Sequence, residues 1–127
     1  MMRRCLAILC LFVASTGLAR AGGDAKAGAM VFKKCAACHT ATEPVHKVGP
    51  SLMGVVGRPV ATAPGYSYSS AMQAFGGGKV WDEAALTTYL ANPRFVVKGT
   101  KMTFAGLKAP ADIANVIAYL KDPASAK

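Results

Sequence analysis

The sequence predicts an all-α domain in which a few helices and long irregular loops wrap around a bound group. Several segments carry apolar residues at helical spacing, and no segment shows the apolar–polar alternation of a half-buried β-strand. A long region between two of these segments is rich in glycine and proline, which is unusual in a small domain unless the region surrounds something. The motif at residues 35–39 indicates what is surrounded.

This motif, CAACH, contains Cys35, Cys38 and His39. It fits C-x-x-C-H, the attachment sequence for a covalently bound haem. Two thiols at this spacing can each form a thioether to one haem vinyl group, and the imidazole that follows is then placed under the iron. We therefore expect one haem c attached through Cys35 and Cys38, with His39 as the proximal ligand of its iron.

Three other interpretations of the two cysteines stay open. A zinc site would need a second pair of ligands, and His46 is the only further histidine. A thiol–disulfide redox motif is expected in a βαβ context, which this sequence lacks. A structural disulfide between Cys35 and Cys38 would close a very small, strained loop.

Residues 1–21 have the pattern of a cleaved secretory signal peptide: two arginines, an apolar run, and Ala19-Arg20-Ala21 as a small-x-small cleavage site. The apolar run is shorter than the roughly 20 residues of a transmembrane helix, which disfavours the alternative of an uncleaved anchor. Cys5 and Cys10 would leave with this segment. We expect one small haem domain of residues 22–127, soluble in the oxidising periplasm.

The chain is basic, and cleavage would lower its formal net charge from +9 to +6 because three arginines precede residue 22. A basic balance can indicate nucleic acid, a membrane surface or an acidic protein as the partner. The sequence has no Arg-rich run and no nucleic-acid-binding motif. For an exported haem domain we expect an acidic protein partner, no nucleic acid, and contact with a membrane only through partners.

The first helix is expected from Asp24, a good N-cap, to about Lys34. Gly28 would allow close contact with another helix because it has no Cβ, and Met30 is expected to fill the core. The other expected helices are a short one within residues 67–75, one over residues 83–90 that stops near Asn92-Pro93, and one from near Pro110 to near Asp122-Pro123.

Eight motifs follow one another from Gly23 to about Lys121: GDAKAG, CAACHT, KVGPSLMGVVGR, APGYSYSSA, VW, YLANP, GTKMTFAGL and IAYLK. CAACH alone would indicate only a c-type haem. The ordered set resembles a class I cytochrome c of the mitochondrial and bacterial c2-like type, and it covers essentially the whole mature domain. The resemblance implies a fold of a few helices around one haem, with the first and last helices in contact through Gly28, Phe32 and Tyr119.

The resemblance also implies the second iron ligand, Met102, at the end of the loop Gly99-Thr100-Lys101-Met102. A thioether is a soft ligand, and Met/His ligation raises the haem potential. The competing sulfurs are those of Met30, Met53 and Met72.

Further haem contacts follow from the same resemblance. The carbonyl of Pro50 would accept the N–H of His39 and orient that ring. Arg58, Tyr68 and Trp81 would lie around the haem propionates. Tyr89 and Thr100 would line the pocket on the methionine side, and Phe104 would lie beside the exposed haem edge. The alternative for the residues expected around the propionates is that Tyr68 and Trp81 are simple core aromatics and Arg58 is a surface charge.

The sequence departs from the family pattern at a few places. Met72 stands where mitochondrial relatives usually carry a polar residue, and Phe95 replaces a residue that is often lysine. The loop after His39 is about one residue shorter than in mitochondrial relatives, and the region around Gly76 about two residues longer. None of these changes touches an expected ligand.

The resemblance implies a monomeric one-electron carrier between membrane redox complexes, from a cytochrome bc complex to a terminal oxidase or photosynthetic reaction centre. Two filled axial positions leave no open site for a substrate, so no enzyme activity is expected. The alternatives are a peroxidase-like enzyme or a haem-based ligand sensor, if Met102 is not a stable ligand. Docking to acidic partner faces is expected to use a ring of lysines around the haem edge: Lys33, Lys34, Lys47, Lys98, Lys101 and Lys108.

Overall fold

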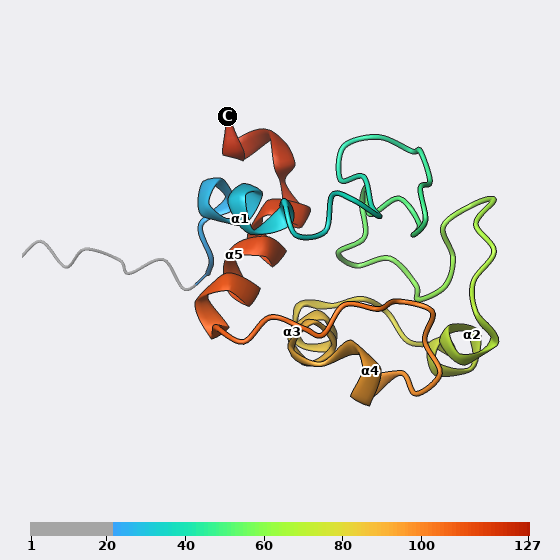
Figure 1. The fold of residues 1–127 in the computed structure, drawn as a ribbon. Coiled ribbons are helices and arrows are strands. Elements are labelled where there is room, and N and C mark those ends of the chain that lie inside the picture. Colours follow the sequence, from blue (N-terminus) through green and yellow to red (C-terminus); the bar gives the residue numbers. More distant parts are fainter. Residues whose placement is uncertain (1–21) are drawn as a thin grey trace, which may run out of the picture.

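The computed structural model describes residues 22–127, in which helices alternate with long irregular segments (Figure 1). The expected signal peptide, residues 1–21, lies outside the described residues. The helices are α1 (Ala25–Phe32), α2 (Ser70–Gly76), α3 (Glu83–Ala91), α4 (Pro93–Val96), α5 (Pro110–Lys121) and the short 3-10 helix η1 (Pro123–Ala126). Within residues 22–127 the nearest approach to a sheet is one isolated bridge between Pro59 and Val80. The predicted all-α fold is therefore confirmed.

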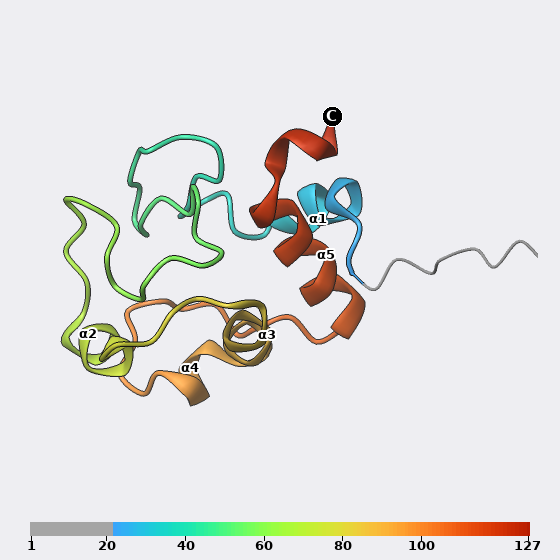
Figure 2. The same ribbon diagram turned by 180° about the vertical axis from the view of Figure 1, so that it is seen from behind.

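The first and last helices cross in close contact, and both views place α1 against α5 (Figures 1 and 2). Gly28 makes the approach possible, because a Cβ at this position would collide with the backbone carbonyl of Asn115. The rings of Phe32 and Tyr119 pack beside this crossing with their centroids 5.4 Å apart. The expected contact among Gly28, Phe32 and Tyr119 is thus confirmed.

The start of α1 is also as predicted, since the Asp24 carboxylate accepts hydrogen bonds from the backbone N–H groups of Lys26 and Ala27. The prediction for Met30 was wrong: this side chain is 59% exposed. The helix turns Gly28, Val31 and Phe32 inward, and Met30 lies on the opposite face.

Two short helices were not predicted, because Pro93 and Pro123 were taken only as stop signals. α3 does end at Ala91, but Pro93 then opens α4 from the first helical position, where its missing N–H costs nothing. The Asn92 side chain caps α4 by accepting a bond from the N–H of Phe95 at 3.3 Å. Pro123 opens η1 in the same way.

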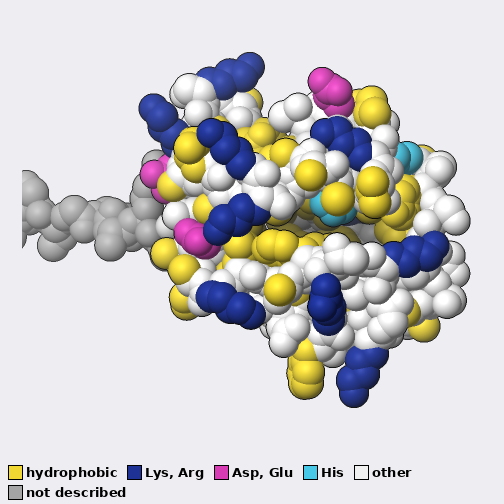
Figure 3. Space-filling model, viewed as in Figure 1, with side chains coloured by type: hydrophobic (Ala, Val, Ile, Leu, Met, Phe, Trp, Pro, Cys, Tyr) yellow, Lys and Arg dark blue, Asp and Glu magenta, His cyan; other side chains and the backbone are white. Residues whose placement is uncertain are grey.

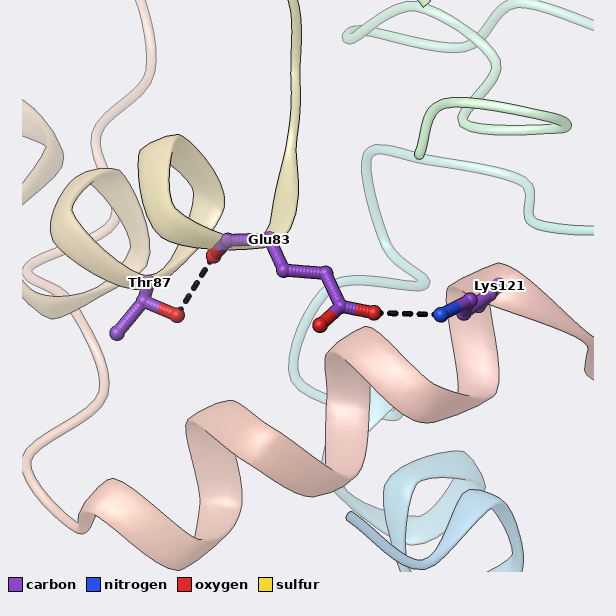
Figure 4. Close-up of polar contacts among 3 residues, drawn as sticks. All are labelled: Glu83, Thr87 and Lys121. Atoms are coloured by element: carbon purple, nitrogen blue, oxygen red, sulfur yellow. Dashed lines mark hydrogen bonds and ion pairs between the residues drawn. The ribbon is translucent and has the colours of Figure 1, made fainter. Parts of the chain in front are cut away.

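The third and fifth helices are joined at the surface by an ion pair between Glu83 and Lys121, with Oε1 and Nζ 2.7 Å apart (Figure 4). The Thr87 hydroxyl donates to the Glu83 carbonyl one turn along the same helix. Both charged side chains are mostly exposed, so water screens the pair and its stabilisation is only about 0–1 kcal/mol.

The predicted long irregular region follows α1 and reaches to α2 (Figure 1). It is held by buried apolar residues that join the same core as α3 and α5, among them Ala41, Val55 and Val60. Backbone bonds also connect it to the chain before α3, with Gly57 N–H donating to the Trp81 carbonyl at 2.7 Å. The region therefore has a defined path without regular helices.

Candidate functional site

The CAACH segment forms turns directly after α1. The N–H groups of Cys38 and His39 both donate to the Cys35 carbonyl, at 3.1 and 3.0 Å. Both thiols are free, so the structural disulfide is not formed, and Cys35 is half-buried whereas Cys38 is exposed. Burial raises the pKa of the Cys35 thiol, an effect that the positive charge of Lys34 opposes.

The imidazole of His39 is oriented by the backbone that follows it. Its Nδ1 lies 2.7 Å from the Pro50 carbonyl oxygen, as predicted. A carbonyl only accepts, so the proton is on Nδ1 and the lone pair of Nε2 is left for a metal. Burial lowers the His39 pKa, which favours this neutral form although the bond to Pro50 acts in the opposite direction.

Gly49 is a residue of this site that the sequence analysis missed. A Cβ at Gly49 would collide with the ring of His39, so the backbone can pass the imidazole this closely only at a glycine. The signal was Gly49 itself, directly before Pro50, and this glycine was interpreted only as one of the breakers in the irregular region.

On the methionine side, the structure brings Tyr89, Thr100 and Met102 together. The Tyr89 hydroxyl donates to the Met102 sulfur at 3.3 Å, and the Met102 N–H donates to the Thr100 hydroxyl oxygen at 3.2 Å. Burial raises the Tyr89 pKa, with a hydrogen bond to Thr100 acting the other way, so the phenol stays a donor. The structure thus brings together three residues that were predicted to share one pocket.

The three competing sulfurs have different surroundings. Met30 and Met53 are 59% and 44% exposed, which suits neither for a ligand in an apolar pocket. Met72 on α2 is partly buried against the core, as Met102 is. Met72 is therefore the one alternative sulfur in comparable surroundings among residues 22–127.

Arg58 reaches into the irregular region rather than into solvent. Its two terminal nitrogens donate to the carbonyls of Met53 and Ser51, at 3.1 and 3.2 Å. Its Nε is buried and has no hydrogen-bond partner, alone among the buried side-chain nitrogens and oxygens of residues 22–127. A buried donor of this kind calls for an acceptor such as a carboxylate.

Arg58 borders a small cavity and is bonded through its backbone to Trp81. A cavity of about 280 Å³ opens beside it, lined also by His46, Ser51 and Met53. The buried Trp81 donates its backbone N–H to the Arg58 carbonyl at 2.9 Å, and its ring lies 4.9 Å from that of Tyr89. Trp81 thus connects the Arg58 side with the methionine side.

The Tyr68 hydroxyl oxygen accepts a bond at 3.0 Å from the N–H of Ala63, a residue that lines this cavity. An oxygen that accepts this bond still has its own hydrogen to donate. A larger hollow of about 870 Å³ lies among Gly22, α1, α5 and η1, but no residue of the predicted site lines it. Of the predicted site residues, only Arg58 lines the smaller cavity, which therefore marks the Arg58 side of the site.

The remaining predicted residues lie at the surface. Phe104 is half-buried against the core. The six predicted docking lysines are all exposed. Lys47 has a second role that the sequence analysis missed, because its ammonium donates to the Ala36 carbonyl at 2.8 Å and so ties the loop to the CAACH segment.

A furrow lined by hydrophobic side chains crosses the face in Figure 3, with a histidine side chain at its upper edge. A neutral imidazole, a soft sulfur, two free thiols and an unpaired buried Arg58 nitrogen are the groups that a haem with propionates would use. The residues present therefore fit a covalently bound haem. Residues 22–127 hold no group of three or more His, Cys, Asp or Glu side chains placed to bind a metal ion, so the zinc interpretation finds no ligand set there.

A family model described as cytochrome c matches residues 25–123. The chain belongs to the cytochrome c family. It is 48% identical over 102 residues to cytochrome c from Sesamum indicum, covering 79% of this chain and 90% of that protein. It is 50% identical over 104 residues to cytochrome c2 from Rhodomicrobium vannielii, covering 80% of this chain and 81% of that protein.

A solved structure, cytochrome cH from Methylobacterium extorquens, superposes with a TM-score of 0.72 at 44% identity. The match covers 78% of this chain and 98% of that one. The resemblance to a class I monohaem cytochrome c is thus confirmed, together with the fold. The cofactor of this cytochrome c is covalently bound haem c with its iron, and its function is to carry electrons.

Proposed function

We propose that this cytochrome c is a periplasmic one-electron carrier in which Cys35 and Cys38 attach the haem and His39 and Met102 bind its iron. The observation that carries this proposal is the pair of oriented ligands. His39 is fixed by the Pro50 carbonyl at 2.7 Å, and Met102 is fixed by the Tyr89 hydroxyl at 3.3 Å. Because hydrogen bonds already fix the orientation of both side chains, they would need little rearrangement when the charge at the iron changes.

The bound haem supplies an iron that alternates between ferric and ferrous states. The residues of the chain keep the surroundings constant through that change. Pro50 keeps the His39 proton on Nδ1, and the buried Tyr89 phenol keeps its proton because burial raises its pKa. Arg58 and Tyr68 would supply donors to the haem propionates, through the unpartnered Arg58 Nε and the Tyr68 hydroxyl. If His39 and Met102 both bind the iron, no coordination position would be left for a substrate, so we infer that the protein is not an enzyme.

We propose that the carrier works as a monomer between membrane complexes, taking electrons from a cytochrome bc complex and giving them to a terminal oxidase or a photosynthetic reaction centre. No helix among residues 22–127 has the length and apolar character to cross a bilayer. The exposed lysines near CAACH and Met102 suit an acidic docking face. The periplasmic location is supported by the signal-peptide pattern of residues 1–21.

Stopped-flow mixing with a purified reduced bc complex, followed by mixing with a purified oxidase, tests this function. We expect fast reduction and reoxidation that both slow as ionic strength rises, because the Debye length shrinks to about 8 Å at physiological salt. Carbon monoxide should hardly alter the ferrous spectrum of a six-coordinate carrier. Rapid carbon monoxide binding, with slow transfer to both complexes, would instead favour a ligand sensor or peroxidase.

A further inference from the structure

Phe95 is the one aromatic residue among the large, strongly exposed apolar side chains of residues 22–127. It is 71% exposed. A single exposed apolar residue is ordinary, but a protruding phenylalanine can bury far more apolar area against a partner than a valine can. Whether Phe95 can make such a contact depends on how its backbone is held and on the charges near it.

The backbone that presents Phe95 is fixed on both sides. Pro93, before it, is among the most deeply buried side chains, and Val97, after it, is 2% exposed. The Phe95 N–H is capped by the Asn92 side chain at 3.3 Å, and the Val97 N–H donates to the Pro93 carbonyl at 2.9 Å. The exposed ring therefore stands on a short helix that is anchored in the core.

The same helix is tied to the loop that carries Met102. The guanidinium of Arg94 donates to the Thr103 carbonyl, one residue after the proposed ligand. The Thr100 N–H donates to the Val97 carbonyl at 3.1 Å. A partner that holds Phe95 would thus hold a segment bonded directly to the methionine-side loop.

The charged residues near Phe95 along the chain have one sign. Residues 84–111 contain Arg94, Lys98, Lys101 and Lys108 and not a single aspartate or glutamate. Over α4, at the lower edge of Figure 3, hydrophobic and Lys or Arg side chains project next to each other. An apolar projection among cations is complementary to an apolar depression among carboxylates.

We propose that Phe95 is an apolar anchor that enters a hydrophobic depression on the acidic docking face of the redox partner. This inference rests on the proposed function and assigns a part of its docking surface. The surrounding cations steer the encounter and set its salt dependence, whereas burial of the Phe95 ring slows dissociation. α4 has only four residues, too few for the amphipathic face that lies in a membrane surface, so a protein is the partner that the geometry favours.

Binding of the holoprotein to an immobilised purified bc complex and to a purified oxidase tests the proposal. We expect Phe95→Ala to raise Kd about tenfold or more for at least one complex, mainly through faster dissociation. The factor should be similar at low and high salt. Met30→Ala is the matched control, since Met30 is 59% exposed on α1 and should leave both Kd values unchanged.

Lys98→Ala provides the electrostatic comparison, because its effect should shrink as salt rises while that of Phe95→Ala persists. A midpoint potential and a thermal midpoint equal to those of the wild type would show that the haem site and the fold of each variant are intact. Equal Kd values for wild type and Phe95→Ala with both complexes would overturn the inference. The inference would also be overturned if Phe95→Ala weakened binding only to phosphatidylglycerol vesicles, because Phe95 would then be a membrane contact. A wild-type protein that exchanges no electrons with either complex would contradict the proposed function instead.

Discussion

The α1–α5 corner and the loop of residues 40–69 are held together by different kinds of contact. At the corner, two backbones touch: a Cβ at Gly23 or Gly28 would strike the carbonyls of α5, and the Asp24 N–H donates to the Asn115 side chain at 2.8 Å. Buried Val116, Ile117 and Leu120 complete the contact. This contact depends on the close fit of two helix surfaces, and the residues that form it have helical spacing in the sequence.

The loop buries a few small apolar residues, among them Val55 and Val60, and its side chains also bond to backbone groups. His46 accepts a bond from the Ser51 N–H at 2.9 Å and lies 2.8 Å from the Pro64 carbonyl. The Tyr66 hydroxyl donates to the Val48 carbonyl at 2.7 Å. Each such bond contributes only about 0.5–1.5 kcal/mol, against an ordering cost of about 1–2 kcal/mol for every backbone residue. The comparison teaches that the loop needs the bound haem more than the helical corner does.

The largest effect should come from removing the haem. In a Cys35→Ala, Cys38→Ala variant purified without haem, we expect loss of most of the roughly 5–15 kcal/mol that stabilises a typical domain. Hydrogen exchange followed by mass spectrometry should find residues 40–69 unprotected first, with more protection left in α1 and α5. Equal protection of the two regions, or a better protected loop, would break the comparison.

The next largest effect is expected at the corner itself. Gly28→Ala would normally gain about 1 kcal/mol of helix propensity, but its Cβ would collide with the Asn115 carbonyl. We expect a net loss of about 2–3 kcal/mol in denaturant unfolding of the holoprotein. Lys26→Ala is the control, because Lys26 is an exposed residue of the same helix and its truncation should change stability little. A stabilised Gly28→Ala variant would contradict the packing account.

A smaller effect is expected inside the loop. His46→Ala removes the bond from Ser51 and the contact with Pro64, so the unfolding free energy should fall by about 1–2 kcal/mol. Hydrogen exchange in the loop should rise while exchange in α5 stays unchanged. Val48→Ala is a matched control, since Val48 is 80% exposed and should cost little. If both variants unfold alike, the His46 bonds do not hold the loop.

The smallest effect should be that of the surface ion pair. A double-mutant cycle with Glu83→Gln and Lys121→Met should give a coupling of about 0–1 kcal/mol, because both side chains are mostly exposed. The coupling should fall further in high salt. A coupling above that range would mean that α3 and α5 depend on this pair rather than on their buried side chains.

The same contrast explains what could be predicted from the sequence. α1 and α5 were predicted because Asp24 marks a helix start and Ile113, Val116, Ile117 and Leu120 have helical spacing. The CAACH motif and the ordered family motifs predicted where the haem would be attached. These signals are local, or they follow a known order along the chain.

The missed features depend on contacts between distant residues. A proline can end one helix and begin another, so Pro93 alone could not reveal α4. Met30 is exposed because α1 packs its opposite face against α5, and this choice of face depends on the contact between the two helices. The bond of Lys47 to Ala36 and the approach of Gly49 to His39 depend on the path of an irregular loop, which no periodicity encodes.

The central claim is that His39 and Met102 both bind the haem iron. The most direct measurement is the visible absorption spectrum of the ferric holoprotein with Met102→Ala, beside Met72→Ala as the control sulfur. We predict that Met102→Ala abolishes the red absorption band of a thioether bound to ferric iron and lowers the potential, whereas Met72→Ala keeps the band. An unchanged band in Met102→Ala, or its loss in Met72→Ala, would contradict the claim and move the ligand to α2.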